Sequence, residues 1–127
     1  MDAIALIPIV LLGLVDVGMV VLGYRAASGA LRRNRLVGIR TRATLASDKA
    51  WAVGHSAGGP AMAFGGVLAL VLLVLPLAVL GVDQVGVLVS VVLSCVALLV
   101  SCIVASVLGD QAARRVRDSS GRRAESH

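Results

Sequence analysis

Three apolar runs dominate the sequence, and each is long enough to cross a lipid bilayer as a helix. They cover about residues 3–23, 61–80 and 85–108. A hydrocarbon core takes roughly 20 helical residues, because each residue advances the helix by about 1.5 Å. Backbone amides find no water in that core, so single runs of this length favour helices over strands. We therefore expect an all-α membrane protein with three transmembrane helices, forming one membrane domain over residues 1–127.

The charged residues lie outside these runs and predict how the chain is oriented. The twelve Lys and Arg residues fall in a loop at 24–59 and in a tail at 109–127. With three crossings, the loop and the tail lie on the same side of the membrane. An excess of Lys and Arg marks the cytoplasmic side. We expect a multi-pass plasma-membrane protein with its N-terminus outside and its C-terminus in the cytoplasm.

The net charge of +5 has more than one possible meaning. A basic soluble domain would suggest nucleic acid as a partner. Here the basic residues flank the predicted spans, where anionic lipid headgroups attract them. The chain has one Trp, one Tyr and one Phe, too few to stack the bases of a nucleic acid. We expect the lipid bilayer and its anionic headgroups as partners, and no nucleic acid.

One acidic residue, Asp16, interrupts the first apolar run. A charge at the centre of a membrane helix costs roughly 2.5–3.5 kcal/mol on insertion scales, unless it is paired or protonated. We expect Asp16 to face the bundle, toward the hydroxyls of Ser90 or Ser94. These serines belong to a stripe of small residues over 90–105, a pattern that lets membrane helices approach closely. Asp16 is either part of a helix–helix hydrogen bond or a proton or ligand site.

A spaced pattern of polar and aromatic residues in the loop is the most informative motif. Its members are Asn34, Gly38, Arg40, Thr41, Thr44, Ser47, Trp51 and His55.

The second half of this motif predicts a helix. Ser47 can cap a free backbone N–H, and the charge of Asp48 favours the positive end of a helix dipole. Trp51 and His55 then lie on one face, four residues apart. An indole is well suited to a membrane interface. We expect a short cytoplasmic interfacial helix leading into the second span.

The first half of the motif predicts a turn with a binding group. Gly38 suggests backbone that passes close to a neighbouring group. Arg40 offers a planar fork suited to a carboxylate or a phosphate, and Thr41 and Thr44 could add hydroxyl contacts. Two interpretations are open: a site for an anionic lipid headgroup, or a clamp on the protein's own C-terminal carbonyls. We assign the other nearby basic residues to charge alone; these are Arg25, Arg32, Arg33 and Arg35.

A metal or cofactor is not expected. His55 has no Cys or second His near it, since the other histidine is His127, and a metal site needs more ligands. We expect His55 to be a hydrogen-bonded structural residue. P-loop, G-x-S-x-G and H-E-x-x-H motifs are absent from the sequence, so we expect no enzyme.

The order and spacing of the loop motif, followed by two apolar runs, resemble the SdpI family of small bacterial membrane proteins. The resemblance covers about residues 32–108 and matches the conserved C-terminal part of a longer namesake. That namesake gives immunity against a secreted peptide toxin. The resemblance therefore implies immunity to, or sensing of, an envelope-active peptide, with signalling to a cytoplasmic partner.

Two further hypotheses come from other classes of protein. The chain could be a small accessory subunit that packs against a larger membrane complex. It could also be a transporter-like homo-oligomer that works through Asp16, because three helices alone hardly enclose a pathway.

Overall fold

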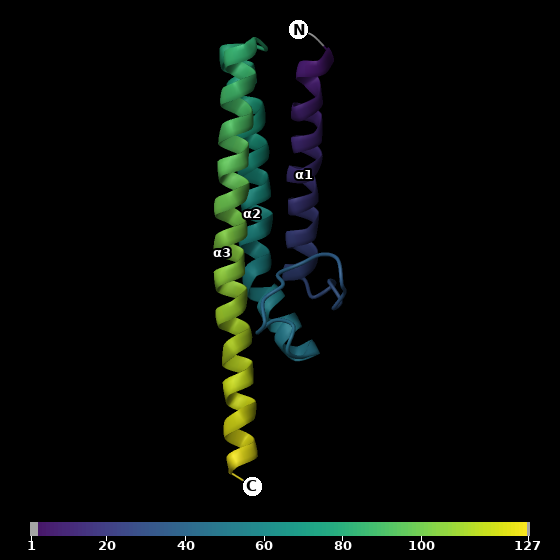
Figure 1. Cartoon of the computed structure of the whole chain (residues 1–127), viewed down its shortest axis with the longest axis vertical. Coiled ribbons are helices and arrows are strands. Elements are labelled where there is room, and N and C mark those ends of the chain that lie inside the picture. The colour runs from purple at the N-terminus through teal and green to yellow at the C-terminus, as the bar shows by residue number, and fades with distance from the viewer. Residues whose placement is uncertain (1–2, 127) are drawn as a thin grey trace.

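A computed structural model describes residues 3–126, and Met1, Asp2 and His127 lie outside this range. The described chain contains three helices, α1 (Ala3–Ala27), α2 (Asp48–Leu80) and α3 (Gln84–Glu125) (Figure 1). Each is long and apolar enough to cross a membrane. The prediction of an all-α membrane protein with three spans is therefore confirmed.

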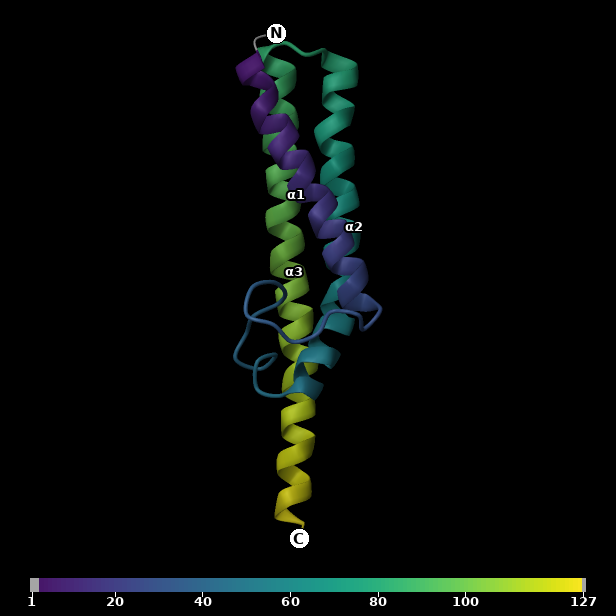
Figure 2. The same ribbon diagram turned by 90° about the vertical axis from the view of Figure 1, so that its right-hand side faces the viewer.

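α2 and α3 form a long antiparallel hairpin, and α1 runs diagonally across it (Figure 2). α1 packs mainly on α2 and touches α3 far less. In Figure 1 the N-terminal half of α1 stands apart from the hairpin, while its C-terminal end meets α2. The position of α1 is thus set chiefly by its crossing with α2.

Glycines bring the helix backbones together at these crossings. A Cβ atom placed on Gly59 of α2 would lie 2.8 Å from the carbonyl oxygen of Gly23 in α1 and would also meet the backbone nitrogen of Ala27. Along the hairpin, a Cβ on Gly58 would lie 2.6 Å from the carbonyl oxygen of Ala105. Small residues permit this close approach of helix backbones. In lipid, the dispersion attraction between the packed helices then stabilises their contact.

The predicted stripe of small residues on α3 faces the bundle rather than lipid. Ser90, Ser94, Ser101 and Ala105 are all buried. Ser101 donates a hydrogen bond to the carbonyl oxygen of Ala61 in α2, at 3.0 Å. The stripe therefore lines the packed side of α3, as its spacing suggested.

The separate interfacial helix that we expected does not exist among the described residues. Ser47 does cap a helix, accepting the N–H of Ala50 at 3.0 Å, but that helix is α2 itself and continues to Leu80. Close packing of Gly58 and Gly59 against α3 and α1 holds the helix together through Pro60. Figure 1 shows the first turns of α2 leaning away from the rest of the helix. The Gly-Gly-Pro sequence thus lies inside α2 and is not a helix boundary.

α3 also runs beyond its predicted end, through most of the predicted tail to Glu125. Ala113 is fully buried and packs with Ala43 and Ala50. Arg114 and Asp110 form an ion pair at 2.6 Å, four residues apart. Contacts of this kind stabilise a helix outside the membrane, and most of the predicted tail is therefore helical, through Glu125.

Candidate functional site

Residues 28–47, which we term the motif loop, fold back onto the first turns of α2 and against α3 (Figure 2). Ile39 is the apolar centre of the loop and clusters with Met62 and Ala105. A Cβ atom on Gly109 of α3 would lie 2.9 Å from the Cδ1 atom of Ile39. Ile39 therefore occupies the seam between α2 and α3 and fixes the loop there.

Trp51 and His55 form the surface of α2 on which the motif loop rests. Their rings are stacked, with centroids 4.0 Å apart, so the predicted common face is confirmed. Only 2% of Trp51 is exposed, and its indole N–H donates to the carbonyl oxygen of Leu31 at 3.0 Å. The indole is therefore covered by the motif loop.

His55 joins the motif loop to α2 through both ring nitrogens. Its Nε2 accepts the N–H of Ile39 at 2.8 Å, so Nδ1 carries the proton and donates to the carbonyl oxygen of Trp51, also at 2.8 Å. Burial beneath the loop lowers the pKa of His55, against a smaller opposing effect of the bond to Trp51. The neutral ring is the form that can accept from Ile39. His55 is thus the hydrogen-bonded structural residue that we expected.

Gly38 lies where the loop backbone crosses these two rings. Its φ angle is +117°, a conformation that side chains strongly disfavour. A Cβ atom there would meet Nε2 of His55 and lie 3.1 Å from the indole of Trp51. The close approach predicted from this glycine is confirmed, and the neighbouring group is the stacked pair.

Asn34 organises the first turn of the motif loop. Its side-chain oxygen accepts the N–H groups of Leu36 and Val37, each at 2.9 Å. Its amide group donates to the carbonyl oxygen of Arg32 at 3.0 Å. This Asx-turn geometry satisfies backbone groups that no helix or strand would satisfy.

Thr41 and Thr44 stabilise the second turn. The buried hydroxyl of Thr44 donates to the carbonyl oxygen of Ile39 at 2.7 Å and accepts the N–H of Thr41 at 3.0 Å. The hydroxyl of Thr41 accepts the N–H of Thr44 at 3.2 Å. The two residues that we considered as ligand contacts thus bind the loop to itself.

Among residues 3–126, Arg40 contacts the loop and not the C-terminal carbonyls. Its guanidinium donates one hydrogen bond, to the carbonyl oxygen of Asn34 at 3.2 Å, and its side chain is exposed. This is an internal contact with a single bond, unlike the forked contact that the residue type suggested.

Arg33 makes the forked contact instead, so our assignment of this residue to charge alone is wrong. One guanidinium nitrogen donates to the carbonyl oxygen of Leu45 at 2.6 Å, and the other pairs with Asp48 at 3.3 Å. Arg33 therefore ties the start of the motif loop to its end and to the first turn of α2. Its partners lie at least twelve residues away, so local spacing gave no signal of this role.

We expect Arg33→Lys to reduce stability more than Arg40→Lys. Lysine lacks the planar fork with which Arg33 reaches two acceptors at once. Because both contacts are exposed, we expect the free energy of unfolding to fall by about 0.5–1.5 kcal/mol. Thermal unfolding in mild detergent measures the difference, with Arg35→Lys, at another exposed arginine of the same loop, as the control. A larger loss at Arg40 than at Arg33 would contradict this ranking.

The motif loop also reaches the part of α3 beyond the predicted span. The hydroxyl of Thr41, followed by the guanidinium of Arg114, holds the pKa of Asp110 below its usual range. Together with the packing of Ala43 on Ala113, this joins the loop, α2 and the C-terminal half of α3 into one unit.

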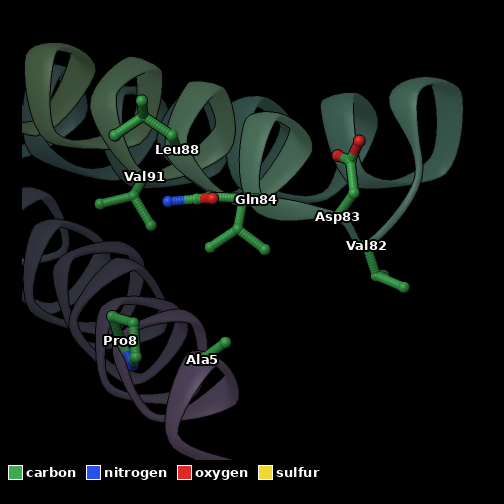
Figure 3. A pocket seen from close by; sticks show the side chains of 8 residues that line it. Ala5, Pro8, Val82, Asp83, Gln84, Leu88 and Val91 are labelled. Carbon is green, nitrogen blue, oxygen red and sulfur yellow. The ribbon is translucent and has the colours of Figure 1, made fainter. Parts of the chain in front are cut away.

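A second feature lies at the opposite end of the bundle, beside the turn that joins α2 to α3. We term it the turn cleft, a cavity of about 640 Å³ between α1 and the first turns of α3 (Figure 3). Its lining residues are Ala5, Pro8, Val82, Asp83, Gln84, Val87, Leu88 and Val91. In Figure 3, Pro8 of α1 and Val91 of α3 border the gap from opposite sides. Sequence patterns did not reveal this cleft, because it arises from the divergence of α1.

Three membrane-crossing helices, with a polar loop folded onto two of them, define a small multi-pass membrane protein. The chain belongs to the SdpI/YfhL protein family, which it matches over residues 30–106. The match contains the complete loop motif from Asn34 to His55 and confirms the resemblance drawn from those residues. Curated proteins and solved structures give no match to this chain.

Proposed function

We propose that this protein binds an envelope-active peptide in the turn cleft and so takes part in immunity to, or sensing of, such peptides. Membership of the SdpI/YfhL family supports the class of function. The turn cleft is the single observation that supports this mode of peptide binding. It is a cavity of about 640 Å³ beside the turn that joins α2 to α3.

The chemistry of the turn cleft suits an amphipathic, cationic peptide. Its walls are mostly aliphatic, with side chains such as Val87 and Val91, and Asp83 and Gln84 lie at its end. Apolar walls bury the apolar face of a peptide, and a carboxylate attracts its basic groups. In the orientation that the basic loop and tail favour, this end faces the outside of the cell, where a secreted peptide arrives.

The motif loop suits the transmission of the bound state better than ligand capture. The polar groups of its motif residues already make hydrogen bonds with the loop backbone, as those of Asn34, Thr44 and His55 do. The loop and the C-terminal half of α3 expose many basic side chains, which a cytoplasmic partner or anionic headgroups could contact. Because α3 extends continuously from the cleft into this region, a shift of α3 at one end would move the other.

The proposal is tested by photocrosslinking with a synthetic amphipathic Leu/Lys peptide that carries a benzophenone. We expect crosslinks to α1 and to residues 82–91 of the protein reconstituted in lipid nanodiscs. Val91→Trp should fill the cleft and lower the apparent affinity about tenfold, equivalent to about 1.4 kcal/mol. Val92→Trp is the matched control, because Val92 is 49% exposed on the neighbouring face and is not among the residues that line the cleft.

A variant that removes the charge of Asp83 distinguishes electrostatic attraction of the peptide from the fit of the peptide to the cleft. Asp83 caps α3 by accepting the N–H of Gly86 at 2.8 Å, and Asn caps helices about as well as Asp. Asp83→Asn should therefore weaken peptide binding at low salt while leaving thermal stability nearly unchanged. Crosslinks confined to other surfaces, or equal binding by the Val91→Trp and Val92→Trp variants, would refute a peptide site in the turn cleft.

A further inference from the structure

A polar cluster lies inside the bundle, roughly halfway along the membrane-crossing part of α1. It consists of Asp16 on α1 with Ser90 and Ser94 on α3, and all three are 0% exposed. The hydroxyl of Ser94 lies 3.1 Å and 3.3 Å from the two carboxylate oxygens of Asp16. A hydroxyl has one proton, so it satisfies only one of these oxygens at a time. Every Lys and Arg lies outside the apolar runs, which leaves no basic side chain at this depth to balance the carboxylate.

Ser90 supplies an independent sign that the cluster is incomplete. Its Oγ atom is buried and has no hydrogen-bond partner among residues 3–126. Ser90 lies four positions before Ser94, so both hydroxyls stand on the same face of α3. Buried hydroxyls are nearly always partnered in proteins. An unpartnered buried hydroxyl therefore lies one helical turn along α3 from Ser94, the residue that contacts the carboxylate of Asp16.

α2 adds a further oxygen near this level. Pro76 has no N–H, so the carbonyl of Leu72 loses its helical donor. Gly65 packs on Ser101 and Gly58 on Ala105 along the antiparallel hairpin. Continuing this register places Pro76 level with Ser90.

We propose that this cluster binds one small monovalent cation, Na⁺, with the carboxylate of Asp16 as the balancing charge. Carboxylate, hydroxyl and carbonyl oxygens are the ligands that hard cations prefer. One carboxylate neutralises one positive charge, whereas a divalent ion would leave an uncompensated charge in the low-dielectric interior. A proton on Asp16 would also remove the charge, but it would leave the oxygen of Ser90 without a partner.

The turn cleft gives such an ion a route from the end of the bundle. Val87 and Val91 line the cleft and flank Ser90 along α3. On α1, Pro8 lines the same cleft and lies about two helical turns from Asp16. Water entering between α1 and α3 would therefore have to advance about two helical turns along α1 to reach the cluster.

The test is a titration of the purified protein in detergent with NaCl, at ionic strength held constant with choline chloride. Thermal unfolding followed by circular dichroism should show a melting temperature that rises and saturates with Na⁺. Asp16→Asn should abolish this rise. Ser90→Ala should raise the Na⁺ concentration at the midpoint about tenfold. Binding of radioactive ²²Na⁺ to the protein gives a direct second measurement.

Ser101→Ala is the matched control, because its hydroxyl is also buried on α3 but donates to the carbonyl oxygen of Ala61. It should lower stability without moving the Na⁺ midpoint. Equal midpoints in the wild-type protein and the Ser90→Ala variant would overturn the proposal. So would a melting temperature that changes with pH but not with Na⁺, since Asp16 would then simply be protonated.

Discussion

Replacing Gly38 by alanine is expected to lift the motif loop off α2. Two penalties coincide, because the φ angle of +117° disfavours any side chain and the new Cβ atom would meet the rings of His55 and Trp51. The steric clash can be relieved only if the hydrogen bond from Ile39 to His55 lengthens or breaks. We expect a loss of about 2–4 kcal/mol in the stability of the loop, from backbone strain and the lost hydrogen bond together.

Trp51 reports this change directly, since it is the one tryptophan of the chain and is buried beneath the loop. Its fluorescence emission should shift to longer wavelength in the Gly38→Ala variant, and acrylamide should quench it more strongly. Gly29→Ala is the matched control, because Gly29 also has a positive φ angle, +77°, but its Cβ would meet nothing within 4 Å. A blue, protected emission in both variants would show that the loop is not held by this contact.

The sequence predicted the parts of this structure that depend on local rules. Hydropathy located the three crossings, because a bilayer imposes one length and one polarity on every helix. The cap at Ser47 and the shared face of Trp51 and His55 follow from helix geometry alone. The contact of Asp16 with Ser94 was also predictable, because a buried carboxylate has few polar groups to choose from in an apolar bundle.

The remaining features depend on contacts between distant segments. Trp51 was expected at the membrane interface, and only the folding of the loop, with Leu31 accepting its indole N–H, shows that it is covered. The role of Arg33 likewise depends on the position of Leu45. The continuity of α2 through Pro60 comes from packing on both neighbouring helices, a tertiary effect that local helix signals do not contain.

The crossing of α1 and α2 is the contact on which both proposed sites depend. α1 touches α3 far less than it touches α2, so α2 sets its distance from Ser94 and the width of the turn cleft. At the crossing, the backbones of Gly23 and Gly59 leave no room for a side chain. Membrane helices held by such close contact separate when a bulky residue is introduced, since lipid competes well for apolar side chains.

Gly59→Leu is therefore expected to displace α1 and to lower stability by about 3 kcal/mol or more, beyond the usual range for overpacking, because the obstructing atoms belong to the backbone. Thermal unfolding in mild detergent measures the loss. Gly18→Leu is the matched control, because Gly18 lies within α1 and a Cβ there would meet nothing within 4 Å.

The same pair of variants shows whether this crossing supports the polar cluster. If α1 moves away in the Gly59→Leu variant, the hydrogen bonds between Asp16 and Ser94 are lost with it, and Asp16→Asn should then cause little further destabilisation. In the Gly18→Leu background, Asp16→Asn should keep the effect that it has in the wild-type protein. Full additivity in the Gly59→Leu background would mean that Asp16 stays paired without the crossing, and that α1 is held by contacts other than Gly23 and Gly59.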